Sequence, residues 1–254
     1  KHLIMKIIGI IPARYESSRF PGKPLADILG ESMIQRVYNK CLSATSLDDV
    51  YVATDDQRIF DHIKSFGGKV IMTKNTHTNG TERCKEALSK IKDNDVDVVI
   101  NIQGDEPFIS PNQIDLLANI FSLYPETQIG TLIKKIEDYD TLFNPNTPKV
   151  VFTLNNDALY FSRNTIPYQR DHEQSTWLDN HDYFKHIGIY GYTSKALNEI
   201  VDTDETTLEC TEKLEQLRWL ENGFRIKVAE TTHETIGIDS PEDLERVIKS
   251  LSNL

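Results

Sequence analysis

Three cations lie close together near the start of the chain, in the stretch GIIPARYESSRFPGK. Arg14, Arg19 and Lys23 are accompanied there by the hydroxyls of Ser17 and Ser18 and by a Pro-Gly pair. An arginine fork matches phosphate oxygens, a lysine is a compact charge, and a glycine lets backbone amides approach an anion closely. These residue types suit a cradle for a triphosphate. A solvated basic loop is the alternative that the spacing leaves open.

Two aspartates outside this stretch are candidates for binding a cation. Asp105 in QGDEP follows an apolar run, and Asp239 in GIDSP directly precedes a helix start. Two carboxylates that converge on one point are costly unless a cation lies between them, and Mg²⁺ is a hard cation of the right kind. Taken singly, Asp105 also fits a turn residue and Asp239 a neighbour of a helix cap.

The chain as a whole is acidic, with a formal net charge of -11 over 254 residues. Such a charge disfavours binding to nucleic acid or to an anionic membrane, so an anionic ligand needs a local cation cluster. The three cysteines lie far apart without a CxxC pair, which indicates neither a disulfide framework nor a zinc site and fits a reduced, cytoplasmic protein. Export is not expected, because Lys6 divides the apolar N-terminal run and no cleavage site follows.

The common nucleotide-binding motifs are missing. The chain has no GxGxxG stretch, and Gly22-Lys23 is followed by Pro24 without the earlier glycine of a GxxxxGK[ST] loop. The seven histidines form no HExxH pattern. Asp55 and Asp56 follow an apolar run and fit the N-terminus of a solvated helix better than a ribose-binding site.

Short apolar runs alternate with amphipathic stretches through the first half of the chain, as in a parallel sheet with connecting helices. We expect strands at residues 6–11, 50–54, 69–72 and 96–102, and helices at residues 32–44, 57–66, 81–91 and 110–123. The predicted fold is α/β, with a doubly wound, mostly parallel, Rossmann-like sheet and a smaller mixed lobe. Ligands of such a sheet bind beyond the carboxyl ends of the strands, where the cationic loop and Asp105 would lie.

The regular alternation of apolar runs and amphipathic stretches ends after residue 130. The pair Asn155-Asn156 predicts a hairpin between residues 149–154 and 158–161, because asparagine tolerates a positive φ. Residues 166–183 are polar and aromatic with little periodicity, and they predict a long excursion that serves as a lid or a subunit contact. Later elements are expected as a strand at 186–192, helices from 194, at 208–221 and from 240, and a strand at 225–229.

The segment PARYESSRFPGKPL resembles the signature of the 3-deoxy-manno-octulosonate (Kdo) cytidylyltransferases, or CMP-Kdo synthetases. Further segments resemble that family in the same order along nearly the whole chain: VYVATDD, NGTERC, NIQGDEPFI, FNPNTPKVV, ALYFSRNTIP, HIGIYGY, LEQLRWLENG and GIDSPEDLERV. Many separate segments at compatible spacing are more specific than one loop. The resemblance implies one nucleotidyltransferase domain, with a nucleotide-binding core at about 1–130 and 203–254 and a sugar-binding and dimerisation part at about 131–202.

The reaction implied is attack by the anomeric 2-hydroxyl of Kdo on the α-phosphorus of CTP, giving CMP-Kdo and diphosphate for lipopolysaccharide biosynthesis. The resemblance implies that Asp105 and Asp239 hold Mg²⁺, and that Arg14 and Lys23 act by charge without a covalent intermediate. The nucleotide-binding residues implied are Arg14, Ser17, Ser18, Arg19, Lys23, Arg83 and Gln103. A helix-surface arginine is the alternative for Arg83.

The sugar carboxylate needs a donor fork, for which the resemblance implies Arg163; an ordinary arginine at a strand end is the alternative. The remaining substrate-binding residues implied are His186, Tyr190, Glu212 and Gln216. Glu212 and Gln216 are four residues apart and would share one face of the expected helix 208–221, which fits a solvated polar face equally well. A homodimer in the cytoplasm is also implied.

Three other functions fit parts of the sequence. A CMP-sialic acid synthetase or another sugar nucleotidyltransferase shares the fold and the acidic sugar, although HIGIYGY and LEQLR resemble the Kdo enzymes. A nonenzymatic nucleotide-binding paralogue would be expected to lack a cation or a carboxylate, yet Arg14, Lys23, Asp105 and Asp239 are all present. An NAD-dependent oxidoreductase is disfavoured by the missing glycine fingerprint.

Overall fold

The structure is a computed structural model that describes residues 5–16, 19–92, 95–234 and 237–252. It divides into two compact units: residues 1–118 together with 235–254, and residues 119–234. The boundaries expected near 130 and 203 lie inside the second unit. Strand β11 (Ile226–Glu230), from the expected core, pairs in parallel with β7 (Ile129–Lys135), which lies mostly in the expected sugar-binding part. The two expected parts therefore share one sheet there.

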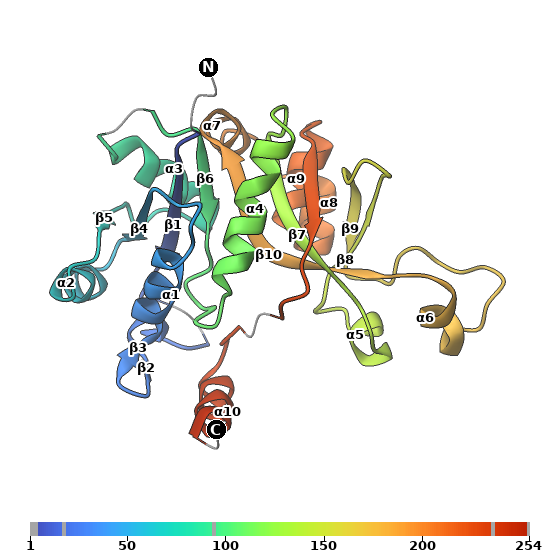
Figure 1. Ribbon diagram of the computed structural model, residues 1–254, viewed down its shortest axis with the longest axis horizontal. Helices are drawn as coiled ribbons and strands as arrows, with labels where there is room; N and C mark the ends of the chain where they lie inside the picture. The colour runs from blue at the N-terminus through green and yellow to red at the C-terminus, as the bar shows by residue number, and fades with distance from the viewer. Residues whose placement is uncertain (1–4, 17–18, 93–94, 235–236, 253–254) are drawn as a thin grey trace. The chain divides into compact units, whose positions relative to one another are not determined.

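The first unit has a parallel sheet in the strand order β6 (Val98–Asn101), β1 (Ile7–Ala13), β4 (Asp49–Thr54) and β5 (Val70–Met72), seen from right to left in Figure 1. The side chains of β1 and β6 are almost entirely buried, as the continuous apolar runs of their sequences predict. The expected parallel α/β sheet is confirmed here.

The chain adds strands first on one side of β1 and then on the other. From β1 it passes through α1 (Met33–Leu42) to β4 and through α2 (Gln57–Ser65) to β5, and α3 (Gly80–Lys90) then returns it to β6 on the other side of β1. Because such crossovers are right-handed, α1 and α2 cover one face and α3 the other. The sheet is therefore doubly wound, and its switch point lies between β1 and β6, where ligands of this fold bind.

The helices of this unit begin at side chains that accept backbone hydrogen bonds. Ser32 accepts from the amide of Gln35, Asp56 from that of Arg58, and Asn79 from that of Glu82. Each cap satisfies an amide that the first helical turn leaves without a partner. The helix α4 (Pro111–Leu123) begins at a proline, which needs no such partner.

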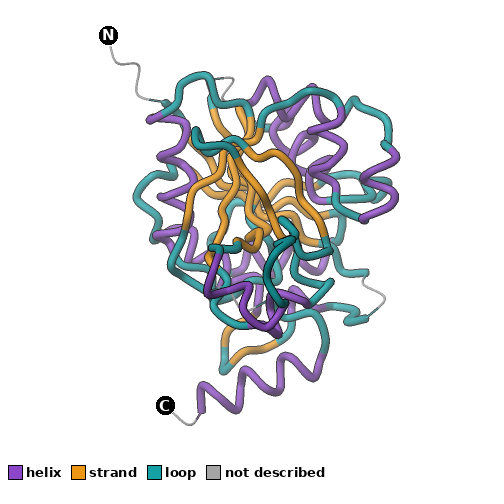
Figure 2. The backbone as a smooth tube through the Cα atoms, turned by 90° about the vertical axis from the view of Figure 1, so that its right-hand side faces the viewer, coloured by secondary structure: helices purple, strands orange, loops and turns teal. Residues whose placement is uncertain are grey.

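The C-terminal segment packs against a small hairpin near the start of the chain. Strands β2 (Asp27–Ile28) and β3 (Glu31–Ser32) form this hairpin, and α10 (Pro241–Ser252) lies beside it in Figures 1 and 2. Buried Ile238 and Val247 contact Ile28 and Met33 in one apolar cluster. Burial of such side chains stabilises the fold by about 1.5–3 kcal/mol each, and it brings the end of the chain to the loop after β1.

The second unit has a mixed sheet. Strand β10 (Phe184–Thr193) pairs antiparallel with β7 and with β8 (Lys149–Phe152), which in turn pairs with β9 (Ala158–Ser162). Asn156 has a φ of 62°, so the predicted β8–β9 hairpin and its reason are confirmed. The helical segments described here are α5 (Tyr139–Phe143), a 3₁₀ turn (Gln174–Thr176), α6 (Trp177–Asn180), α7 (Ser194–Val201), α8 (Thr207–Glu212) and α9 (Glu215–Glu221).

The prediction of a single helix at 208–221 is wrong, because the helix is interrupted between α8 and α9. Lys213 takes a left-handed φ of 53°. The guanidinium of Arg163 donates to the carbonyls of Glu212 and Lys213, which supplies partners for a helix end at this point. Glu212 and Gln216 therefore do not share one face of a helix.

Among the helices of the described residues, not one has the length and apolar character needed to cross a membrane.

Candidate active site

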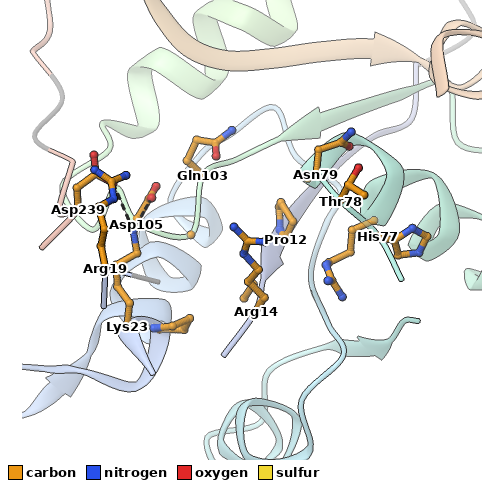
Figure 3. Close-up of a pocket in the computed structure, with 15 residues that line it drawn as sticks. Pro12, Arg14, Arg19, Lys23, His77, Thr78, Asn79, Gln103, Asp105 and Asp239 are labelled. Atoms are coloured by element: carbon orange, nitrogen blue, oxygen red, sulfur yellow. Dashed lines mark hydrogen bonds and ion pairs between the residues drawn. The ribbon is translucent and has the colours of Figure 1, made fainter. Parts of the chain in front are cut away.

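A cavity of about 270 Å³ opens at the switch point of the first unit. Its walls come from the end of β1, the loop after β1, the segment before α3, the loop after β6 and the segment before α10. The lining residues are Pro12, Ala13, Arg14, Arg19, Lys23, Pro24, His77, Thr78, Asn79, Gly80, Arg83, Gln103, Gly104, Asp105 and Asp239 (Figure 3). The carboxyl ends of β1 and β6 thus meet at the cavity, as the fold class predicts.

A tight turn delivers Lys23 into this cavity. Gly22 has a φ of +73°, and its amide donates to the carbonyl of Tyr15 at 2.8 Å. A Cβ atom at Gly22 would lie 3.0 Å from the Tyr15 ring. Glycine is required here both for the left-handed backbone and for this close approach.

The ammonium group of Lys23 is held by acidic and carbonyl oxygens. It donates to Oδ2 of Asp105 at 2.7 Å and to the carbonyl of Ile238 at 3.0 Å, and it lies 3.6 Å from Oδ1 of Asp239. The Lys23 side chain is only 14% exposed, whereas Asp105 and Asp239 are 34% and 58% exposed. The lysine thus lies beneath two carboxylates that remain open to a ligand.

A backbone hydrogen bond joins the two segments that carry these carboxylates. The amide of Ile238 donates to the carbonyl of Asp105 at 3.0 Å. Ser240 and Asp243 exchange the hydrogen bonds that begin α10, so the side chain of Asp239 is not used as a cap. Asp239 is therefore the neighbour of a helix cap, as the alternative for this residue expects, and its carboxylate also faces Lys23 and Arg19.

These carboxylates match one part of a magnesium site. No cluster of three or more His, Cys, Asp or Glu side chains able to hold a metal occurs among the described residues. Magnesium in nucleotide enzymes usually takes one or two carboxylates, and phosphate oxygens and water complete its octahedron. Asp105 and Asp239 already lie near one shared cation, the Lys23 ammonium, so the donor set fits such an ion.

The other predicted nucleotide-binding residues are placed as follows. Arg14 is exposed and lines the cavity between its two ends, and Arg19 lies 3.4 Å from Oδ1 of Asp239. Gln103 also lines the cavity. Ser17 and Ser18 lie outside the described residues.

Arg83 is buried rather than on a helix surface. Its guanidinium donates to Oδ2 of Asp55 at 3.1 Å and to Oγ1 of Thr73 at 2.6 Å. Asp56 caps α2, as a helix N-terminal acid should, whereas Asp55 is partly exposed and pairs with Arg83. Arg83 lines the cavity while tying three segments together.

Among the described residues that line the cavity, the acidic ones are Asp105 and Asp239, and none lies at the opposite end. Thr78 and Asn79 lie there with His77, and Pro12 lies beside Arg14 in the middle, as Figure 3 shows. Sequence reasoning used the segment NGTERC only for Arg83 and missed this wall. The available signal was Asn79, a good N-cap residue placed just before a glycine and a helical pattern.

Glu106 was also missed. Its Oε2 atom is buried and has no hydrogen-bond partner within the part of the chain that the structure describes. Burial first, and then the adjacent Asp105 charge, raise the pKa of Glu106 to about 7. The sequence places this acid beside Asp105 but does not reveal its burial.

In the second unit the structure brings Arg163 and Glu212 together. The guanidinium of Arg163 donates to the carbonyls of Glu212, Pro145 and Lys213 at 2.6, 3.1 and 3.2 Å. The Glu212 carboxylate accepts from the Arg163 amide and from Ser162 Oγ, at 2.8 and 2.7 Å. The guanidinium has five N–H donors, and these three bonds leave two of them for another acceptor.

His186 and Tyr190 also lie in contact, on β10. Their rings are 5.2 Å apart, and His186 Nε2 lies 2.9 Å from Thr131 Oγ1. Burial lowers the pKa of His186 to about 3, so the ring is neutral at pH 7, and burial raises the pKa of Tyr190. Gln216 is buried on α9, and its Nε2 atom has no hydrogen-bond partner among the described residues.

The fold and the cavity are those of an α/β nucleotide-binding enzyme, and a comparison with family models narrows the class. The model described as "Cytidylyltransferase" matches residues 8–231. The chain therefore belongs to the cytidylyltransferase family.

Similar proteins and a solved structure show to which group of cytidylyltransferases the chain belongs. The chain is 54% identical to the 3-deoxy-manno-octulosonate cytidylyltransferase of Parabacteroides distasonis, over 98% of this chain and 100% of that protein. It is also 54% identical to the protein of the same name from Cytophaga hutchinsonii, over 98% of each chain. A solved structure of CMP:2-keto-3-deoxy-manno-octonic acid synthetase complexed with CTP is 40% identical, with a TM-score of 0.90 over 98% of this chain and 99% of that one. The resemblance seen in the sequence is confirmed: the chain is one of the 3-deoxy-manno-octulosonate cytidylyltransferases.

Proposed function

We propose that the protein transfers the cytidylyl group of CTP to Kdo. The anomeric 2-hydroxyl of Kdo forms a bond to the α-phosphorus, the bond from that phosphorus to the β-phosphate bridging oxygen breaks, and the hydroxyl proton is released. The products are CMP-Kdo and diphosphate. The relatives named for this activity align over nearly the whole chain, which supports the same chemistry here.

The observation that carries the proposal is the position of Lys23 between Asp105 and Asp239. A triphosphate brings several negative charges into an acidic protein, so it needs fixed cations at the place of binding. Lys23 is mostly shielded from solvent and lies against the two carboxylates, and Arg14 and Arg19 line the same cavity. Preorganised charge of this kind stabilises the charge that develops during phosphoryl transfer without a covalent intermediate.

The cavity also suggests how the nucleotide lies. Its end with Lys23, Arg19 and the carboxylates suits the phosphates, while its end at Thr78 and Asn79 suits the uncharged cytosine. Arg14 lies between the two ends and is placed to reach the phosphates. Gln103 and Arg83 complete the proposed nucleotide-binding residues.

Asp105 and Asp239 would hold magnesium. The ion supplies charge neutralisation at the phosphate oxygens and a template for their orientation. Magnesium at a nucleotide site usually needs only one or two protein carboxylates, and this number agrees with the pair Asp105 and Asp239.

The proposed sugar-binding residues lie in the second unit. Arg163 keeps two donors for the Kdo carboxylate, and the orphan amide of Gln216 is suited to a sugar hydroxyl. Glu212 acts through Arg163 and Ser162, which it fixes. We assign His186, neutral and paired with Thr131, and Tyr190 to the same task.

A substrate panel tests the proposal. Purified protein with Mg²⁺ is offered Kdo or N-acetylneuraminic acid together with CTP, UTP, ATP or GTP, and diphosphate release is measured. Kdo with CTP should give the fastest release. Faster turnover of the sialic acid would favour a CMP-sialic acid synthetase, and no release from folded protein would favour a nonenzymatic nucleotide binder.

We also propose a homodimer formed through the second unit and a cytoplasmic location. Exposed Tyr168 and Phe143 surround the buried Trp177 and form an aromatic surface suited to a subunit contact. Cys41, Cys84 and Cys210 are free thiols, which fits a reducing compartment. Light scattering at several protein concentrations tests the dimer.

A further inference from the structure

We propose that Glu82 and Glu86 of α3 are positioning residues that set the wall of the nucleotide cavity at residues 77–79. Neither glutamate is among the residues that line the cavity, so both act through this wall. The inference rests on the proposed function, because it assumes that the end of the cavity at residues 77–79 receives the nucleobase.

The wall belongs to the connection from β5 to α3. This connection has no strand or helix of its own, so its shape depends on the side chains that hold it. His77, Thr78 and Asn79 line the cavity from this connection. What fixes these residues therefore fixes one end of the cavity.

Glu82 binds the wall at several points. Its Oε2 accepts from the amide of Thr78 at 2.9 Å, and its Oε1 accepts from Thr78 Oγ1 at 2.9 Å and from Asn79 Nδ2 at 3.1 Å. The amide of Glu82 in turn donates to Asn79 Oδ1 at 2.8 Å. Both oxygens of one carboxylate thus hold two cavity-lining residues, in bonds of the strong, charge-assisted kind.

Glu86, one helical turn further on, binds the same connection. Its Oε2 accepts from the amide of Lys74 at 2.9 Å and contacts His77 Nε2, while His77 Nδ1 lies 3.6 Å from Glu82 Oε2. The imidazole is therefore fixed between the two carboxylates. Lys90 closes the arrangement by pairing with Glu86 Oε1 at 2.6 Å and donating to the carbonyl of Met72 at 2.7 Å.

The spacing explains why both carboxylates act on one segment. Residues four apart lie on the same face of a helix, so Glu82 and Glu86 both face the connection. This is the same sequence segment, NGTERCKE, in which Asn79 begins the helix and Arg83 donates to Thr73 Oγ1. The helix therefore anchors the connection at both of its ends.

The consequence for function concerns nucleotide choice. Cytosine and uracil differ only in the groups at N3 and C4, and a site distinguishes them only if its hydrogen-bonding groups are held still. If the wall loosens, the nucleotide should bind more weakly and the preference for cytosine should fall. The phosphates and the reacting atoms, held by Lys23 and its partners, should be little affected.

Glu82→Ala and Glu82→Gln test the inference beside Glu245→Ala, an exposed glutamate of α10 as the matched control. For each protein we would measure kcat, KM for CTP, the ratio of kcat/KM for CTP over UTP, and CTP binding by calorimetry without Kdo. Glu82→Ala should raise KM and the calorimetric Kd about tenfold while kcat stays within about threefold of the parent. The CTP-over-UTP ratio should fall at least about threefold, Glu82→Gln should be intermediate because it keeps one acceptor, and the control should be unchanged.

The inference is overturned if folded Glu82→Ala keeps KM, Kd and the CTP-over-UTP ratio within about twofold of the parent. It is also overturned if kcat falls tenfold with KM unchanged, since that would place Glu82 in the chemical step. If Glu82→Ala does not fold, Glu82→Gln and Glu86→Gln are judged by the same limits. Parent protein that fails to bind CTP would instead refute the proposed function, so the two failures can be told apart.

Discussion

The ammonium nitrogen of Lys23 lies 2.7 Å from Oδ2 of Asp105, inside the cavity at the switch point of the sheet. This contact joins the loop after β1 to the loop after β6. It places a cation where the carboxylates of Asp105 and Asp239 come together. The position of the Lys23 ammonium group therefore depends on both loops. The proposed chemistry depends on this contact, and so do the predictions below.

Replacing Lys23 by alanine should lower turnover about a hundredfold or more, because a preorganised charge at the phosphates is lost and one such contact typically contributes about 3 kcal/mol. The measurement is kcat for diphosphate release at saturating CTP and Kdo. Lys249→Ala removes an exposed lysine from α10 and should be neutral. Near-normal turnover in folded Lys23→Ala would remove Lys23 from the mechanism.

Replacing Asp105 by asparagine should raise the Mg²⁺ concentration for half-maximal activity at least about tenfold, because a neutral amide is a poorer ligand for a hard cation. Asp239→Asn should act in the same direction. The control is Asp204→Asn, an exposed aspartate of the second unit. An unchanged magnesium dependence in both variants would exclude these carboxylates as metal ligands.

Replacing Arg163 by lysine should raise KM for Kdo about tenfold or more, with little change in KM for CTP. Lysine keeps the charge but cannot provide the two remaining N–H donors of a fork. Circular dichroism would check that the break between α8 and α9, which Arg163 supports, is retained. Arg225→Lys, at an exposed arginine, is the control, and an effect confined to CTP would contradict the assignment.

Burial of His186 predicts a pH dependence of stability. Its pKa is lowered from 6.5 to about 3 in the folded protein, so protons bind the unfolded chain more tightly. The free energy of unfolding should therefore be unaffected by this group above pH 6.5 and should fall as the pH decreases from 6.5 towards 3. The slope approaches about 1.4 kcal/mol per pH unit for one proton.

Urea denaturation at pH values from 7.5 to 4.5 (about one unit apart) measures this slope. His186→Gln should have a shallower loss of stability below pH 6.5 than the parent protein. His172→Gln, at an exposed histidine, should follow the parent. Equal slopes for parent and His186→Gln would show that the ring of His186 is not buried as a neutral group.

The sequence was informative wherever one local signal decides the structure. The apolar runs around Ile10 and Val52 predict buried parallel strands, and both lie in the sheet. The hairpin at Asn156 follows from the tolerance of asparagine for positive φ. The cluster of Arg14, Arg19 and Lys23 likewise predicts a cavity with fixed positive charge, since all three line it.

The misses arise where tertiary contacts override the local pattern. Lys213 adopts a left-handed φ that its residue type does not predict, and Arg163, far away in sequence, bonds to the carbonyls beside it. Strand β7 was overlooked because Gly130 and Thr131 interrupt its apolar run, yet Thr131 Oγ1 donates to the Ile189 carbonyl at 2.7 Å. The approach of Asp105 to Asp239 came from the family resemblance, since the amide of Ile238 that joins them has no local signal.

The most direct test of the central claim is a crystal structure with Mn²⁺ in place of Mg²⁺ and a non-hydrolysable analogue of CTP, with anomalous scattering recorded for manganese. The proposed mechanism predicts a manganese peak ligated by Asp105 and Asp239, with the phosphates in contact with Lys23 and Arg14. A manganese peak away from both carboxylates, with the phosphates bound outside this cavity, would contradict it.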